Sequence, residues 1–166
     1  MIRHRIFETA WGFCGVVAGP RGVLRTFLPQ SSHRGLERSI RREPGDSEED
    51  AGLLSNLVAE VQAYFRGEPA WFEVELDLGG ISSFRRRVLE ACRSIPRGQT
   101  ASYAELARQA GSPRATRAAG SAMAHNPCPL VIPCHRVVRS DGSLGGFSST
   151  RGVRQKQRLL MLEGAL

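Results

Sequence analysis

The 166-residue sequence has little lysine, few aromatic residues and no long apolar run. Only one of its 23 basic residues is lysine, and aromatic residues make up 7% of the chain. The longest stretch without Asp, Glu, Lys or Arg, residues 118–135, contains three prolines, so no transmembrane helix is expected. The four cysteines form no CxxC pair, which favours reduced thiols over a disulfide framework. The N-terminus lacks the apolar core of a signal peptide, so we expect a cytoplasmic location.

The charge differs strongly between the two halves of the chain. Residues 1–79 hold nine basic and twelve acidic residues, net −3, whereas residues 80–166 hold 14 basic and four acidic residues, net +10. A chain of this length fits one compact domain or two small ones. The charge difference favours two domains, with Gly79-Gly80 as the boundary, and an anionic partner for the second.

The first half combines strand and helix patterns. Two apolar runs, 11–17 and 23–28, flank a Gly-Pro-Arg-Gly turn and predict a β-hairpin. Residues 30–50 are polar and predict a surface loop. Apolar residues at helical spacing predict a helix over 54–65, and strict alternation predicts a strand over 72–78. This half is therefore expected to form a small α/β domain.

The second half predicts mainly α-helix. Apolar positions in residues 84–95 lie on one helix face. A short helix over 102–110 ends at Gly111, and another begins with Ser112 as its N-cap and runs to about Ala124. Such a pair is typical of a helix-turn-helix, although many helix pairs bind no nucleic acid. The net charge of +10 favours the nucleic-acid interpretation.

The later helix of this pair has almost no bulky side chains except Arg114 and Arg117. Small residues such as Ala118 and Gly120 fill most of its other positions. Two interpretations stay open. The helix approaches nucleic acid closely while its arginines reach inward, or its small residues pack tightly against a neighbouring helix.

Residues 126–138 contain the side chains best suited to chemistry. Cys134 is followed by His135 within a run of apolar residues. A thiol reacts as the thiolate, and a nearby histidine or positive charge lowers its pKa. Two alternatives are a buried, inert cysteine and a zinc site formed by Cys128, Cys134 and His135, which lacks a second close ligand pair.

The Pro-Cys-His-Arg-Val motif at 133–137 resembles the active-site motif of the O6-alkylguanine-DNA alkyltransferases. The likeness covers about residues 81–165, whereas the N-terminal half matches only in general character. The resemblance implies an α/β N-terminal domain, 1–79, followed by a mainly α-helical C-terminal domain, 80–166, that contains a helix-turn-helix. Further motifs stand in the family's order: the Tyr103 helix, Arg117, Asn126-Pro127, Gly145-Gly146-Phe147-Ser148 and Leu162-Glu163-Gly164.

The resemblance implies DNA repair by direct and irreversible transfer of the alkyl group from O6-methylguanine to Cys134, once per molecule. O4-methylthymine is a second candidate substrate. The implied partner is double-stranded DNA, with the damaged nucleotide flipped out of the duplex. No cofactor, metal or membrane association is expected, and the protein is expected to be a monomer.

The same resemblance implies the roles of individual residues. His135 takes the thiol proton of Cys134 through a water, and Glu163 orients His135. Asn126 ties down the segment before the nucleophile, and Tyr103 hydrogen-bonds N3 of the leaving guanine. Arg117 enters the vacated space in the base stack, the N–H of Ser148 faces O6, and the carbonyls of Cys134 and Val137 accept from the exocyclic amine. The substrate- and DNA-contacting set is Arg114, Arg117, Ala118, Arg136, Val137, Phe147 and Ser148.

Two features of the sequence depart from the pattern of the family. Phe147 stands where the family usually has tyrosine, so a hydroxyl is missing from the pocket wall. The zinc site of some members has no matching set, because His4, Cys14 and His33 fit ordinary surface or strand positions.

Two rival functions remain as alternatives. A DNA-binding protein that senses lesions without transfer would not need Cys134 and its partners. A cysteine hydrolase is disfavoured because its cysteine and histidine should lie on facing elements.

Overall fold

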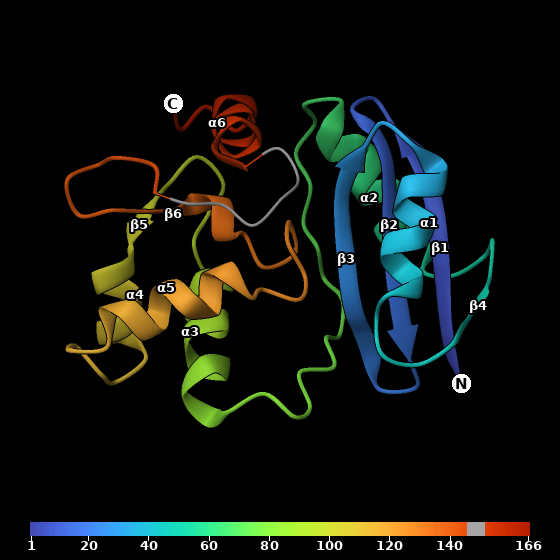
Figure 1. The fold of residues 1–166 in the computed structure, drawn as a ribbon. Coiled ribbons are helices and arrows are strands. Elements are labelled where there is room, and N and C mark those ends of the chain that lie inside the picture. The colour runs from blue at the N-terminus through green and yellow to red at the C-terminus, as the bar shows by residue number, and fades with distance from the viewer. Residues whose placement is uncertain (146–151) are drawn as a thin grey trace. The chain divides into compact units, whose positions relative to one another are not determined.

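The computed structural model describes residues 1–145 and 152–166 and divides the chain into two compact units, Met1–Leu78 and Gly79–Leu166 (Figure 1). The first unit is a small sheet with helices, and the second is mainly helical. In the described part of the chain, every helix is too short or too polar to cross a membrane.

A four-stranded sheet, ordered β3-β2-β1-β4, forms the centre of the first unit. β1 (Ile2–Thr9), β2 (Gly12–Gly19) and β3 (Gly22–Gln30) form an antiparallel meander, and β4 (Ser47–Glu49) pairs parallel with β1. The predicted hairpin is confirmed as β2 and β3. It turns at Gly22, whose φ of 137° and close approach to the Glu75 carbonyl exclude a side chain.

The predicted surface loop over 30–50 is wrong, because it contains a helix and a strand. Ser32 caps α1 (His33–Arg41) by accepting a hydrogen bond from the Gly35 N–H at 3.0 Å. Only Leu36 and Ile40 of this helix are buried, where they pack with Val17 of β2. Two apolar residues at one-turn spacing are enough to dock the helix, although the segment as a whole is polar.

The predicted helix over 54–65 is confirmed as α2 (Ser55–Phe65), whereas the predicted strand over 72–78 is wrong. Within that segment, only Leu76 forms a bridge, to Val23 of β3. Two hydrogen bonds support it, from the Val23 N–H to the Glu75 carbonyl at 2.9 Å and from the Asp77 N–H to the Val23 carbonyl at 2.8 Å. The alternating pattern therefore holds the segment against the sheet edge without forming a longer ladder.

The helices of the second unit are α3 (Ser83–Arg93), α4 (Tyr103–Gln109), α5 (Thr116–Ala124) and α6 (Gly152–Leu162). A minimal parallel pair, β5 (Ala101–Ser102) and β6 (Val137–Val138), joins the start of α4 to the segment after Cys134. Ser102 and Glu105 form a reciprocal capping box that starts α4. The predicted N-cap of the next helix is wrong: Ser112 accepts from the Ala115 N–H in a separate turn, and α5 starts at Thr116.

Candidate active site

The candidate nucleophile, Cys134, begins a single 3-10 turn, η1 (Cys134–Arg136), directly before β6. Its side chain is buried in the core of the second unit, 3% exposed. Burial raises the pKa of the Cys134 thiol, and the hydrogen bond with Asn126 and the positive charge of Lys156 lower it by less. The resting thiol therefore carries its proton at neutral pH and needs a base at the moment of reaction.

His135 is placed to be that base. The ring is fully buried, and its Nε2 is hydrogen-bonded to Oε1 of Glu163. Burial lowers the pKa of His135 and outweighs the opposing effect of the Glu163 carboxylate, so the ring is neutral at pH 7. Its Nδ1 is buried and has no hydrogen-bond partner among residues 1–145 and 152–166. With the Nε2 proton directed at Glu163, Nδ1 holds a lone pair that can accept a proton.

Glu163 follows the end of α6, and its buried carboxylate is held by two side chains of η1. Arg136 donates from Nε to Oε2 at 2.8 Å and from Nη2 to Oε1 at 3.0 Å, and its Nη1 donates to the Ile95 carbonyl at 2.7 Å. Burial raises the pKa of Glu163, but the hydrogen bonds from His135 and Arg136 outweigh it and hold the pKa at about 2. The carboxylate therefore stays ionised at neutral pH.

The side chain of Arg136 points in a different direction from the one expected. Sequence reasoning placed Arg136 among the substrate- or DNA-contacting residues. Its side chain is only 11% exposed, and it donates within the unit to Glu163 and to the Ile95 carbonyl. Arg136 thus joins η1 to the end of α6 and to Ile95, the second residue after α3.

Asn126 lies between the end of α5 and the nucleophile. Its Nδ2 donates to the Ile132 carbonyl at 2.8 Å, and its Oδ1 accepts from the Cys128 N–H at 2.9 Å. The two bonds close a loop in which Leu130 adopts a positive φ of 77°, a backbone conformation that costs energy for a side chain of this size. Asn126 therefore holds a strained loop in place next to Cys134.

Lys156, which sequence reasoning did not select, completes the site. It is fully buried on α6, donates to the Val137 carbonyl, and lies 3.4 Å from the Tyr103 hydroxyl. Burial lowers the pKa of Lys156 to about 8. Burial also raises the pKa of half-buried Tyr103, so its hydroxyl keeps its proton. The available signal was the single lysine, three and four residues before the apolar pair Leu159 and Leu160, on the buried face of a helix.

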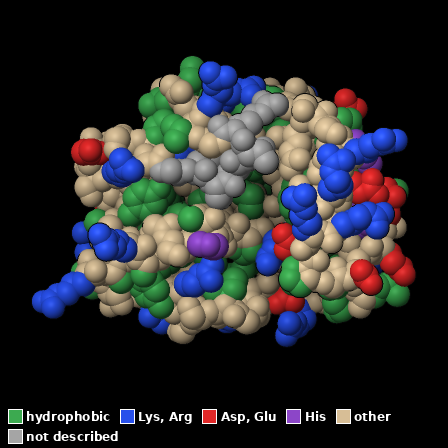
Figure 2. Space-filling view, viewed as in Figure 1, with side chains coloured by type: hydrophobic (Ala, Val, Ile, Leu, Met, Phe, Trp, Pro, Cys, Tyr) green, Lys and Arg blue, Asp and Glu red, His purple; other side chains and the backbone are tan. Residues whose placement is uncertain are grey.

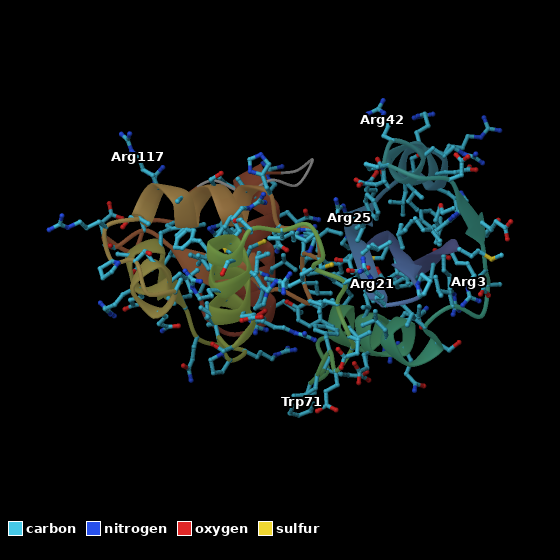
Figure 3. All side chains as sticks on the ribbon, turned by 90° about the horizontal axis from the view of Figure 1, so that it is seen from below. Arg3, Arg21, Arg25, Arg42, Trp71 and Arg117 are labelled. Carbon is cyan, nitrogen blue, oxygen red and sulfur yellow. The ribbon has the colours of Figure 1, made fainter. Side chains whose placement is uncertain are left out.

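The remaining predicted residues fall into two groups. Phe147 and Ser148 lie outside the described residues, and Gly145 just before them approaches Tyr103 so closely that a Cβ there would lie 3.0 Å from its hydroxyl. Arg114, Arg117 and Ala118 are exposed at the start of α5, and Figure 3 shows Arg117 pointing away from its helix. The opposite face of α5 is buried through Ala119, Ala122 and Met123.

All four cysteines are free and buried. Within residues 1–145 and 152–166, no three side chains of His, Cys, Asp or Glu are grouped to hold a metal ion. The geometry therefore defines a protein in which a buried cysteine precedes a neutral histidine that is hydrogen-bonded to an ionised carboxylate, in a unit whose helix α5 exposes arginine and small residues.

Comparisons with known proteins agree with that class. The family described as 6-O-methylguanine DNA methyltransferase, DNA binding domain, matches residues 83–165. A methylated-DNA–protein-cysteine methyltransferase of Mycobacterium tuberculosis is 46% identical over 163 residues, 98% of this chain and 93% of that protein. One from Methanothermobacter thermautotrophicus is 39% identical over 151 residues, 90% of this chain and 78% of that protein.

A solved structure of the Mycobacterium tuberculosis O6-methylguanine methyltransferase superimposes with a TM-score of 0.80 at 35% identity, over 99% of this chain and 94% of that one. The structure of the protein from that organism in complex with DNA gives 0.80 at 36% identity, over 98% and 93%. The chain belongs to the methylated-DNA–protein-cysteine methyltransferase family.

Because Glu163 is buried and ionised, we expect the free energy of unfolding to decrease at acidic pH. The pKa of Glu163 is about 2 in the folded protein and about 4.3 in an unfolded chain. Its contribution, about 3 kcal/mol, is therefore complete above about pH 4.3 and lost as the pH falls toward 2. Urea denaturation should show that Glu163→Gln lowers the free energy of unfolding at neutral pH and flattens its decline between about pH 5 and pH 3. The exposed Glu68→Gln should keep the wild-type pH dependence, and parallel curves for wild type and Glu163→Gln would contradict the account.

Proposed function

We propose that Cys134 accepts the alkyl group from O6 of guanine in DNA by direct, in-line displacement. The Sγ–carbon bond forms as the carbon–O6 bond breaks, and the electron pair of that bond stays on the guanine. The thiol proton passes to His135, which returns it to solvent, and the guanine takes up one proton from solvent, so no net proton is gained or lost. The observation that carries this proposal is that His135 and Arg136, the two residues directly after buried Cys134, both bond to the buried Glu163 carboxylate.

Proton removal falls to His135. Because the Cys134 pKa is raised by burial, the thiol is not pre-ionised, and deprotonation must accompany the displacement. Nδ1 of His135 takes the proton through a water, and the resulting imidazolium is stabilised by the ionised Glu163 at Nε2. Arg136 keeps Glu163 from taking that proton, since it holds the carboxylate in its ionised form.

Tyr103 and Lys156 stabilise the leaving guanine. The Tyr103 hydroxyl donates a hydrogen bond to N3 of the flipped base as negative charge develops there. The ammonium of Lys156 lies 3.4 Å behind that hydroxyl and 5.7 Å from the centre of its ring, so it makes the phenol a stronger donor. Lys156 also holds the Val137 carbonyl, whose second lone pair accepts from the exocyclic amine of guanine.

The helix pair α4 and α5 acts as a helix-turn-helix on DNA. The two helices pack against one another, and α5 presents an exposed face of small residues with Arg114 and Arg117 at its start. A helix without bulk can approach the duplex closely while Arg117 fills the space left by the flipped nucleotide. Other arginines of this basic unit add phosphate contacts that do not depend on sequence.

The reaction ends after one transfer. A thioether formed on Cys134 is chemically stable to water, and a thiolate is a poor leaving group, so neither His135 nor the nearby Lys156 and Cys92 can remove the alkyl group. The alkylated protein is therefore the final product, and each molecule repairs one lesion.

The proposed acceptor is tested by mass. After incubation with duplex DNA carrying O6-methylguanine, the Cys134 peptide should gain the mass of one methylene, and Cys134→Ala should remove no methyl group while still binding DNA. Cys14→Ala, which removes a buried thiol in the other unit, should repair normally. Methyl loss from DNA with Cys134→Ala, or a gain on another cysteine, would contradict the proposal. If the wild type bound the damaged duplex but transferred no methyl group, the result would favour the lesion-sensing alternative.

The role of Arg117 is tested by comparing duplex and free base. Arg117→Ala should slow repair in duplex DNA by about tenfold or more, because about 1.4 kcal/mol of lost support for the flipped state corresponds to a factor of ten. Its reaction with free O6-benzylguanine should be unchanged, because no base has to be flipped. Arg66→Ala, which removes an exposed arginine of the first unit that pairs with Glu68, should affect neither rate. Equal losses on both substrates would show that Arg117 supports the fold instead.

A further inference from the structure

A row of arginines runs along the outer face of α1 in the first unit. Arg34, Arg38 and Arg42 follow one another at intervals of four residues, so they lie on one side of the helix. All three are exposed, and their side chains form no hydrogen bond or ion pair with the described residues. Figure 2 shows basic side chains gathered over α1, and Figure 3 shows Arg42 projecting outward.

The helix holds this row rigidly. Leu36 and Ile40 are buried on the opposite face, and a Cβ on Gly15 of β2 would lie within 3.6 Å of both, so helix and sheet are in close contact. Ser32 caps the first turn. The arginines are therefore presented from a docked helix rather than a free loop.

Stability of the helix explains Arg38 and Arg42, which lie at its C-terminal end, but not Arg34. Cations favour the C-terminal end of a helix and disfavour its N-terminal end, yet Arg34 lies in the first turn, which contains no acidic residue. Nearby acidic groups are already engaged: Glu37 pairs with Arg41 at 2.9 Å and Glu43 with Arg25 at 2.8 Å. The row keeps its full positive charge on a unit whose sequence is net acidic.

We propose that this row, Arg34, Arg38 and Arg42, is a second contact surface for the phosphate backbone of duplex DNA, separate from α5. The three guanidinium groups spread over about 12 Å along the helix axis, at a rise of 1.5 Å per residue. Such a line suits an extended polyanion better than one small anion, and a duplex carries a charge about every 1.7 Å. Guanidinium groups bind phosphate oxygens through paired hydrogen bonds.

The pattern does not suit a membrane surface. A helix that lies on a bilayer buries an apolar face among the lipids. Leu36 and Ile40, the only large apolar residues of α1, are already packed against the sheet. Because the inference rests on the proposed function for the identity of the polyanion, its test separates DNA binding from transfer chemistry.

The test is the salt dependence of binding to an undamaged duplex, measured by fluorescence anisotropy on the full chain. Each phosphate contact contributes about 0.9 to the slope of log K against log salt, so R34A/R38A/R42A should reduce the slope by about two to three. R3A/R21A/R66A removes the same charge from paired arginines of the same unit and should leave the slope nearly unchanged. R34K/R38K/R42K should restore most of it.

The remaining outcomes separate the alternatives. Reaction with free O6-benzylguanine should be equal in all variants, and loss of that reaction in the wild type would count against the proposed function, not against this surface. Melting curves and the lysine variant show whether a loss reflects unfolding. An unchanged slope, or an equal loss in the control variant, would overturn the proposal. It would also be overturned if R34A/R38A/R42A lost affinity only for vesicles of phosphatidylserine and phosphatidylcholine.

Discussion

The chemistry of the second unit depends on one buried carboxylate. Glu163 is enclosed by Arg136 and His135, and burying an ionised group of this kind is costly unless it is paired and fully hydrogen-bonded. Here Arg136 supplies the opposite charge and His135 takes the remaining acceptor position. Because Arg136 also donates to the Ile95 carbonyl, the guanidinium that holds Glu163 fixes η1 both to the end of α6 and to the second residue after α3.

This arrangement determines where Cys134 lies and when it reacts. Cys134, His135 and Arg136 are consecutive in a single tight turn, so anchoring the last two leaves the thiol little freedom. Asn126 constrains the turn from the preceding loop, and Lys156 holds the Val137 carbonyl that follows it. Burial keeps the thiol protonated, and the hydrogen bond with Asn126 and the positive charge of Lys156 oppose this effect only in part.

Sequence could predict the features encoded by contiguous residues. The hairpin around Gly22, the amphipathic α3 and the Cys134-His135 motif were of this kind. α1 was missed because its two buried residues, Leu36 and Ile40, are outnumbered by charged neighbours, and tertiary packing supplies the rest. Arg136 and Lys156 show a different limit, since sequence reports a charge but not whether its side chain turns inward. Both are directed by partners distant in sequence, Glu163 and Tyr103.

The central claim is that burial keeps His135 neutral while ionised Glu163 holds the ring proton on Nε2 and leaves Nδ1 bare. The chain has four histidines, so nitrogen-15 NMR of selectively labelled protein can resolve the ring, with His135→Gln for assignment. At neutral pH the spectrum should show His135 with a protonated Nε2 and an unprotonated Nδ1. A neutral ring protonated at Nδ1, or a doubly protonated imidazolium in the resting protein, would contradict the account.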